Sequence, residues 1–419
     1  MTTFSEEVHK AIFNSANSGG ITLDISNLAN KNDSQFNTLP YINLPNLEVI
    51  SAKNNKLFDA NSIGNLVFLK TIDLSNNDLY RIELAAHSQK LDVQSNNISD
   101  LNLIGLQNMV DLNCSHNKIS NLNLLQDCSK MLYLSCSNNS IESIPNLPLL
   151  SVLMANQNNI SRIITFSNIK ELYLRENKLR GDVDVSSMFN LRILDVGKNN
   201  IKHLSCSPNL TTLFINKNQL ESLQVPNTIR VLDCSNNNIT SLFLPREIDE
   251  LNCSGCRLTS SSFLTRSNLT ILNISNNQLS DLPELVCLKT LTCDNNSITS
   301  VSVSSLLIEL SCNNNKIKSL PRLSDLTYLS CQNNQIEFIP NYGELQYLYC
   351  DSNPITELPN TPLLKKLHCM KTRVSRVPFY KYLKFLKCNL SNQISVSFAK
   401  NIDDVDVVDG EYVTVKIII

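Results

Sequence analysis

Residues 288–374 contain the segments LKTLTCDNNSI, LIELSCNNNKI, LTYLSCQNNQI, LQYLYCDSNPI and LKKLHCMKTRV. They begin at a constant period of 19, at Leu288, Leu307, Leu326, Leu345 and Leu364. The segments share the frame L-x-x-L-x-C-x-x-N-x-I, with substitutions in the last of them. A fixed period of this length indicates that one structural unit is repeated along the chain, and it takes precedence over local predictions of secondary structure. The stretch therefore predicts a stack of similar turns.

The spacing within one unit predicts a strand followed by a turn. In the first segment, Leu291 and Cys293 would share one face of a strand, and Thr290 and Thr292 would point the other way. Asn296 follows where the strand must turn, and its amide can bond backbone groups that no sheet partner reaches. About four large apolar groups per unit contribute roughly 6–12 kcal/mol through burial, whereas ordering such a unit costs on the order of 20–30 kcal/mol. One unit therefore cannot fold alone, but stacked neighbours can.

The frame matches the leucine-rich repeat (LRR) consensus, and the chain resembles an LRR solenoid. The resemblance implies an α/β repeat fold: a curved solenoid with one long parallel sheet on its concave side. It also implies a convex side of extended, proline-containing or short helical segments. The short repeats resemble those of bacterial LRR effectors that are delivered into host cells, and L-x-C-x-x-N repeats resemble those of large DNA viruses.

The position of Asn296 recurs along most of the chain, and we call it the ladder position. From Leu47 onward it is occupied 18 times, by Asn55, Asn77, Asn96, Asn117, Asn139, Asn158, Asn177, Asn199, Asn218, Asn237, Cys256, Asn277, Asn296, Asn315, Asn334, Asn353, Thr372 and Ser391. The 17 spacings are twelve of 19, two of 21 and three of 22. We expect a helical turn or a wider loop in the longer repeats, and a stabilising rather than a functional role for the ladder asparagines.

The repeat frame divides the chain into three parts. Residues 1–43 are predicted to form an N-terminal cap, with an amphipathic helix over 5–17 and an atypical first repeat, because a solenoid needs its open end covered. Residues 44–391 are predicted to form the solenoid of about 18 repeats. Residues 392–419 are predicted to form a C-terminal cap with a β-hairpin, because VDVVDGEYVTVKI (405–417) alternates with period two around Asp409-Gly410.

Composition argues against several classes of partner and location. The net charge of −2 gives no electrostatic case for binding nucleic acid or a membrane surface. No apolar run is long enough to span a bilayer, and the N-terminus lacks the pattern of a secretory signal. Ten of the 14 cysteines occupy inward strand positions, which favours a reducing compartment. We expect a cytoplasmic monomer, located in the host cytosol if it is an effector or viral protein.

No motif in the sequence predicts catalysis, a metal site or a cofactor. The lone C-x-x-C motif, Cys253 to Cys256, is explained by the repeat, because its cysteines fall on the core and ladder positions. No nucleophile elbow, phosphate-binding loop or zinc-protease motif is present. We expect a non-enzymatic scaffold that binds protein partners of unknown identity through its concave face. An extracellular adhesin or receptor-type LRR fragment and a regulatory subunit of an enzyme remain alternatives.

Two patches of outward strand residues are candidate binding sites. The first comprises Tyr328, Tyr347, Tyr349, Lys366, His368, Met370 and Phe385. The second comprises Tyr133, Met154, Tyr173, Arg175 and Phe214. Adjacent exposed aromatic, Met and Arg side chains resemble interface hot spots, although any strand favours aromatic residues. Lysines around the first patch predict a partner with an acidic edge, and the second patch is the runner-up.

Overall fold

The computed structural model describes residues 4–28, 37–82, 88–101, 106–265, 267–303, 305–388, 395–398, 404–407 and 415–417. The chain forms two compact units, Met1–Leu210 and Thr211–Ile419.

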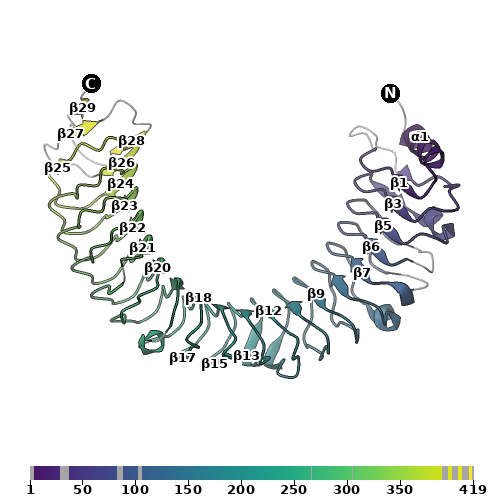
Figure 1. The fold of residues 1–419 in the computed structure, drawn as a ribbon, viewed down its shortest axis with the longest axis horizontal. Coiled ribbons are helices and arrows are strands. Elements are labelled where there is room, and N and C mark those ends of the chain that lie inside the picture. Colours follow the sequence, from purple (N-terminus) through teal and green to yellow (C-terminus); the bar gives the residue numbers. More distant parts are fainter. Residues whose placement is uncertain are drawn as a thin grey trace. The chain divides into compact units, whose positions relative to one another are not determined.

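The first unit is built on a parallel sheet of short strands, one from each repeat (Figure 1). In spatial order they are β1 (Thr22–Asp24), β3 (Val49–Ser51), β5 (Thr71–Asp73), β6 (Lys90–Asp92), β7 (Asp111–Asn113), β8 (Tyr133–Ser135), β9 (Val152–Met154), β10 (Glu171–Tyr173) and β12 (Ile193–Asp195). Each strand pairs in parallel with its neighbour, and corresponding repeat positions lie opposite one another, as Leu23 lies opposite Ile50. The atypical first repeat thus carries a strand in the same register as the next repeat.

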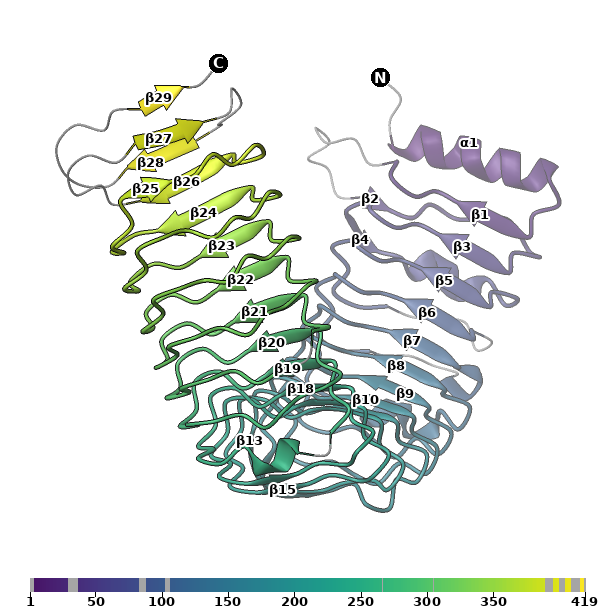
Figure 2. The same ribbon diagram turned by 60° about the vertical axis from the view of Figure 1, so that its left-hand side comes forward.

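The second unit repeats this arrangement (Figure 2). Its parallel strands are β14 (Thr212–Phe214), β16 (Val231–Asp233), β18 (Glu250–Asn252), β19 (Ile271–Asn273), β20 (Thr290–Thr292), β21 (Glu309–Ser311), β22 (Tyr328–Ser330), β23 (Tyr347–Tyr349), β24 (Lys366–Cys369), β26 (Phe385–Cys388) and β28 (Asp404–Val407). From β19 to β26 the partners are separated by one period of the repeat, as Leu291 and Leu310 are.

Burial follows the alternation predicted from the repeat frame. Leu291 and Cys293 have no exposed surface, whereas Thr290 and Thr292 on either side are half-buried on the opposite face. We call this opposite face of each sheet the strand face, and the side formed by the connecting segments the outer side. The predicted fold class, an LRR solenoid with parallel strands, is confirmed.

Asparagines at the ladder position bond the backbone where the strands end. The Asn296 amide nitrogen donates to Ile274 O at 3.0 Å and to Cys293 O at 3.1 Å, and its oxygen accepts from Leu279 N–H at 3.0 Å. One side chain therefore satisfies three backbone groups in two repeats, which is the arrangement a turn without a sheet partner requires. The amide of Asn315 repeats the pattern one turn further on.

The residue before the ladder position has a left-handed backbone conformation, with a positive φ. Its φ is 53° at Lys198, 56° at Lys217 and 55° at Asn236, and 64° at Gly255. Asparagine and glycine adopt this conformation more easily than other residues do, which explains the frequent Asn-Asn pairs of the sequence. At Gly255 the space is also restricted, because a Cβ would lie 2.8 Å from the side-chain oxygen of Asn236.

The 3-10 helices of the described outer side lie in the longer repeats. Four of the five longer repeats contain a 3-10 helix, namely η1 (Asn61–Asn65), η2 (Leu106–Asn108), η3 (Asn123–Asp127) and η4 (Ser262–Leu264). The fifth contains β11 (Arg180–Asp184), which pairs with β13 (Asn200–Ser205). Further outer strands are β2 (Asn37–Thr38) with β4 (Leu57–Asp59), β15 (Leu223–Gln224) with β17 (Leu242–Phe243), and β25 (Arg376–Val377) with β27 (Ser395–Phe398) and β29 (Val415–Ile417).

An N-terminal helix, α1 (Phe4–Asn17), lies next to β1. Phe4 and Val8 are buried, and the Ser15 hydroxyl donates to Thr22 O at 2.6 Å. The helix ends before Gly19 and Gly20, whose φ values are 102° and 68°. One face of the helix is therefore buried, and it lies beside the first strand.

The C-terminal strands do not form the predicted β-hairpin. β28 pairs in parallel with β26, and β29 pairs in parallel with β27. The partners again occupy equivalent positions one period apart, as Leu386 and Val405 do, so the repeat continues past residue 391. The Asp409-Gly410 turn lies outside the described residues. The prediction failed because alternation with period two is the same in a hairpin strand and in a half-buried parallel strand.

Candidate functional site

Three tyrosines on two neighbouring strands form the centre of the first candidate patch. Tyr328 lies opposite Tyr347 in the register of β22 and β23, and their ring centroids are 6.4 Å apart. The Tyr328 and Tyr349 centroids are 5.6 Å apart, with the rings tilted by 45°. These separations are typical of favourable aromatic pairs. Burial, followed by the proximity of Tyr349, raises the pKa of Tyr328, so its hydroxyl stays neutral at physiological pH.

The next two strands add cationic and imidazole groups to the tyrosines. Lys366 Nζ lies 5.4 Å from the ring centroid of Tyr349 and 5.7 Å from that of Phe385, within the range of cation–π attraction. The His368 ring contacts Tyr349 edge-on, with centroids 4.8 Å apart. The register explains these contacts, because Tyr349 lies opposite His368 and Lys366 lies opposite Phe385.

The structure thus brings six of the seven predicted residues of the first patch into direct ring or cation contact on β22, β23, β24 and β26. We call the full set the aromatic patch: Tyr328, Tyr347, Tyr349, Lys366, His368, Met370 and Phe385. Tyr347 and Phe385 are 38% and 41% exposed, and the other members are half-buried. Met370 follows β24, and its N–H donates to Asp351 Oδ1 at 2.6 Å. The aromatic patch is a partly packed, accessible surface on the strand face.

The second candidate patch is only partly brought together in one unit. Met154 lies opposite Tyr173 in the register of β9 and β10. Tyr133 and Met154 are 48% and 42% exposed. The Tyr173 hydroxyl donates to Glu171 at 3.0 Å, and burial followed by this bond raises its pKa to about 12.

Two further members of this second patch differ from the expectation. The guanidinium of Arg175 lies 3.8 Å from Asp195 Oδ1, so it faces a carboxylate of its own chain. Phe214 is half-buried on β14, which belongs to the second unit.

The cysteines are placed as core residues rather than as reactive groups. All 14 are free thiols, and twelve are buried. Burial raises the pKa of Cys114 to about 12, and burial raises that of Cys253 well above its ordinary value. The Cys256 thiol at the ladder position donates to Cys234 O at 3.5 Å. Because thiolate is the nucleophilic form, Cys114 and Cys253 are poorly suited to nucleophilic attack. Hydrogen bonds with Cys234 and Cys369 instead lower the pKa values of Cys256 and Cys388.

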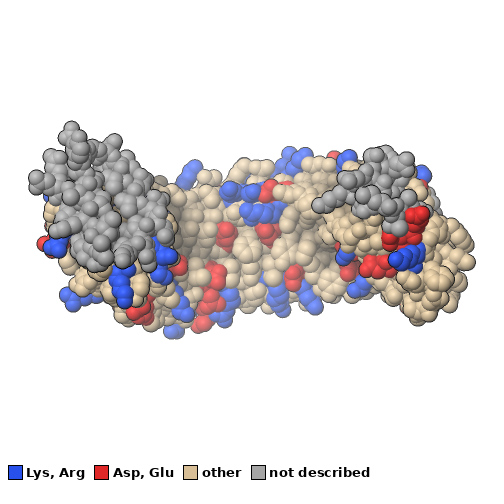
Figure 3. Space-filling view, turned by 90° about the horizontal axis from the view of Figure 1, so that it is seen from above, with Lys and Arg blue, Asp and Glu red and all other residues tan. Residues whose placement is uncertain are grey.

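Charges and possible metal ligands are dispersed. On the face seen in Figure 3, Lys and Arg side chains are intermixed with Asp and Glu, without an extended field of one sign. Among the described residues, no group of three or more His, Cys, Asp or Glu could hold a metal ion. No helix in the described part of the chain has the length and apolar character needed to cross a membrane.

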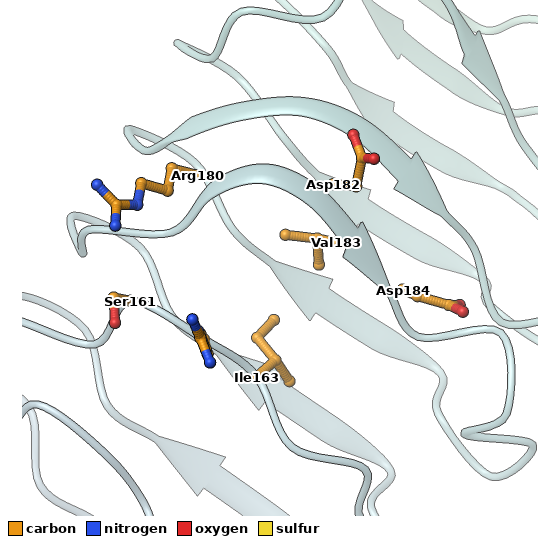
Figure 4. A pocket seen from close by; sticks show the side chains of 7 residues that line it. Ser161, Ile163, Arg180, Asp182, Val183 and Asp184 are labelled. Carbon is orange, nitrogen blue, oxygen red and sulfur yellow. The ribbon is translucent and has the colours of Figure 1, made fainter.

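A surface that the sequence reasoning missed lies on the outer side of the first unit. A cavity of about 530 Å³ is lined by Ser161, Arg162, Ile163, Arg180, Asp182, Val183 and Asp184 (Figure 4). The signal that could have found it is the change in the spacing of ladder positions, from 19 before Asn177 to 22 after it.

Comparisons with known proteins agree with the repeat geometry. The leucine rich repeat family matches residues 268–287. A putative leucine-rich repeat protein of Acanthamoeba polyphaga mimivirus is 32% identical over 127 residues, which span 30% of this chain and 30% of the viral protein. The in-register strands, the asparagine ladder and these matches together show a leucine-rich repeat fold.

Solved structures share this fold over nearly the whole length of the chain. YopM from Yersinia enterocolitica is similar with a TM-score of 0.85 and 24% identity, covering 96% of this chain and 91% of that one. YopM from Yersinia pestis, described as a leucine-rich effector protein, is similar with a TM-score of 0.60 and 24% identity, covering 88% and 92% of the two chains. The fold is thus that of LRR proteins from bacteria, and sequence similarity reaches a viral LRR protein.

Proposed function

We propose that this protein is a non-enzymatic scaffold that binds a partner protein at the aromatic patch on the strand face of its second unit. The observation that carries the proposal is the cluster of Tyr328, Tyr347, Tyr349, His368 and Lys366 in mutual contact on adjacent strands. Aromatic residues with few rotatable bonds concentrate binding energy at protein interfaces. Contacts among the rings hold them in place before a partner arrives, which lowers the entropy cost of association.

The partner has an acidic edge in this proposal. Lys366 and Lys387 lie on the strand face, half-buried, and Lys371 is exposed at the turn that follows β24. Positive charge around an apolar centre favours and orients a partner of opposite charge. The mixed charges of the surface give no comparable support for nucleic acid.

The setting we propose is the cytosol, and host cytosol if the protein acts as an effector or a viral protein. Similarity to a Yersinia leucine-rich effector protein and to a mimivirus protein supports this setting. Fourteen free thiols support a reducing compartment, and they weigh against the alternative of an extracellular adhesin or receptor fragment. A regulatory subunit of an enzyme would use the same surface and differ only in its partner. We propose that the chain acts as a monomer.

The aromatic patch predicts the effect of a double substitution. We expect Tyr347→Ala with Tyr349→Ala to weaken binding of the partner by at least about 2 kcal/mol, because interface hot spots of this kind lose that much on truncation. The partner is first identified by cross-linking and mass spectrometry in a lysate, and its affinity for purified variants is then measured by calorimetry.

A matched control uses an aromatic residue away from the strand face. Phe338 is 61% exposed and follows the ladder turn on the outer side, so Phe338→Ala should leave affinity unchanged. If the double variant binds like the wild type, the aromatic patch is not the site, and Tyr133→Ala with Met154→Ala tests the second patch.

A further inference from the structure

On the outer side of the first unit, the segments of two consecutive repeats separate from one another. The spacing of ladder positions widens here, from 19 between Asn158 and Asn177 to 22 between Asn177 and Asn199. The additional residues let the outer segment of the longer repeat extend as β11, beside residues 161–164 of the shorter one. One backbone hydrogen bond joins the two segments before they separate, from Lys178 N–H to Ile160 O at 2.9 Å. Residues 160–166 and 178–185 are all described, and no other backbone hydrogen bond joins them.

The backbone of β11 is satisfied on one edge only. Asn200 N–H donates to Leu179 O just before β11, and Val185 N–H just after β11 donates to Ser205 O, so the backbone groups of both flanking residues face β13. The extra residue at the bulge in the pairing is Lys202 of β13, which leaves β11 regular. Because the direction of backbone groups alternates along a strand, those of Arg180, Asp182 and Asp184 point to the opposite edge. That edge offers a row of donors and acceptors to an added strand.

A cavity lies along this open edge. It has a volume of about 530 Å³, within the range of ligand pockets. Figure 4 shows Ile163 and Val183 near one another between the two walls, with Arg180 and Asp184 toward opposite ends of β11. A second cavity of about 220 Å³ adjoins it through Ser161, Arg162 and Ile163, and its lining includes the buried Phe166. The floor is therefore apolar, and the rim is polar.

The charged groups at the rim are not equivalent. Asp182 lies 2.7 Å from His203 Nδ1, and Asp184 accepts from Ser186 N–H at 2.8 Å. Arg162 and Arg180 line the cavity, and neither forms an ion pair within the described part of the chain. Two guanidinium groups without carboxylate partners favour an incoming carboxylate at the end of β11 that carries Arg180.

We propose that the open edge of β11 accepts an extended segment of a partner protein as an added parallel strand, with a carboxylate of that segment beside Arg180. Backbone bonds to Arg180, Asp182 and Asp184 would supply affinity, and alternate side chains would supply specificity. On the outward face, an acidic residue lies beside Arg180 and a basic residue beside Asp182, because opposite charges stabilise directly facing strand positions. On the inward face, β-branched residues cover Val183 and Ile163. This site is separate from the aromatic patch and does not depend on it.

A pair of peptides with one composition tests the pairing. The probe is a capped, fluorescein-labelled peptide SSEVKVSS, in which Glu would face Arg180 and Lys would face Asp182. Its control, SSKVEVSS, exchanges the two charges and places like charges opposite one another. Binding to the full chain is followed by fluorescence anisotropy. We expect saturable binding of the probe at least fivefold tighter than that of the control. No saturable binding at millimolar concentration, or equal affinity for both peptides, overturns the proposal.

A pair of substitutions tests the backbone edge. Asp182→Pro and Asp182→Ala both remove the carboxylate, but only proline removes the N–H that faces the cavity. We expect the proline variant to bind the probe at least tenfold more weakly than wild type, and the alanine variant to bind within about threefold of it. Equal binding by a folded proline variant overturns the proposal.

Hydrogen–deuterium exchange of the wild-type chain keeps the test valid if the proline variant does not fold. The probe should slow exchange of amides in the segment that contains β11, and it should not slow exchange in the strands of the second unit. Unchanged exchange at β11 in the presence of saturating probe also overturns the proposal.

Discussion

The asparagine amide at the ladder position concentrates several backbone interactions in one side chain. Asn315 donates to Cys293 O at 2.9 Å and to Cys312 O at 3.2 Å, and it accepts from Ile298 N–H at 2.9 Å. Thr372 takes this position in a later repeat, and within the described residues its hydroxyl bonds only Cys369 O of its own strand. The replacement of asparagine by Thr372 therefore removes the side-chain bond between repeats at this turn.

Removing this amide should destabilise the protein measurably. We expect Asn296→Ala or Asn315→Ala to lower the free energy of unfolding by roughly 1–3 kcal/mol, because each leaves buried backbone groups without partners. Urea denaturation followed by circular dichroism gives the value. Lys318→Ala, at an exposed position of the same repeat, is the control and should change little. Unchanged midpoints in both asparagine variants would contradict this account of the ladder.

At the scale of elements, the helix α1 lies next to the first strand and buries one of its faces. Val8 is fully buried and Phe13 is 67% exposed, so one helix carries a packed and a free apolar residue. The amphipathic pattern over residues 5–17 was enough to predict a helix here. It was not enough to predict which residues are buried, since Ala16, two helical turns after Val8 on the same apolar face, is exposed.

The difference in burial between Val8 and Phe13 allows a paired test of whether α1 caps the stack. Val8→Asp should cost about 2–4 kcal/mol, because it places a carboxyl group in an apolar contact without a partner. Phe13→Asp should change stability by less than about 0.5 kcal/mol, as surface substitutions usually do. Thermal denaturation of both variants provides the comparison. Equal effects would mean that α1 does not cap the stack.

The elements of the outer side were less predictable than the strands of the sheet. The regular repeat frame predicts the positions of β20 to β24 because Leu291 and its equivalents recur without interruption. The same frame does not predict whether extra residues form a 3-10 helix, as at η1, or a strand, as at β11. That choice depends on contacts with the neighbouring repeat. The aromatic patch was predictable as a set of outward positions, but the contacts of Lys366 with two rings depend on side-chain rotamers that no period encodes.

At the scale of the whole molecule, the thiols form part of the interior. Cys293, Cys312, Cys331, Cys350, Cys369 and Cys388 occupy the same inward position in successive repeats, and all are buried. A small apolar residue fits this position, and free cysteine behaves as one. The cysteine content of the chain therefore reflects packing rather than redox chemistry.

Thiol titration should separate the folded from the unfolded chain. Burial raises the pKa of Cys114 from 9.0 to about 12, so this thiol remains protonated at pH 8 in the folded state. We expect a maleimide to label at most the two half-buried cysteines, Cys206 and Cys287, in native protein, and all 14 in denaturant. Mass spectrometry counts the labels. Rapid labelling of nearly all thiols in native protein would contradict their burial.

The constant register between neighbouring strands has a consequence for how such a chain changes over generations. In the second unit, the strands from β19 to β26 meet their neighbours through equivalent residues of successive repeats. If one whole repeat is inserted or removed in this region, the strands on either side of the change still meet through equivalent residues. This holds wherever in the repeat the change begins. Gain or loss of one whole repeat can thus lengthen or shorten the molecule while the neighbouring strands stay in register. Gain or loss of whole repeats changes the number of positions on the strand face, while point substitution changes the residue at each position.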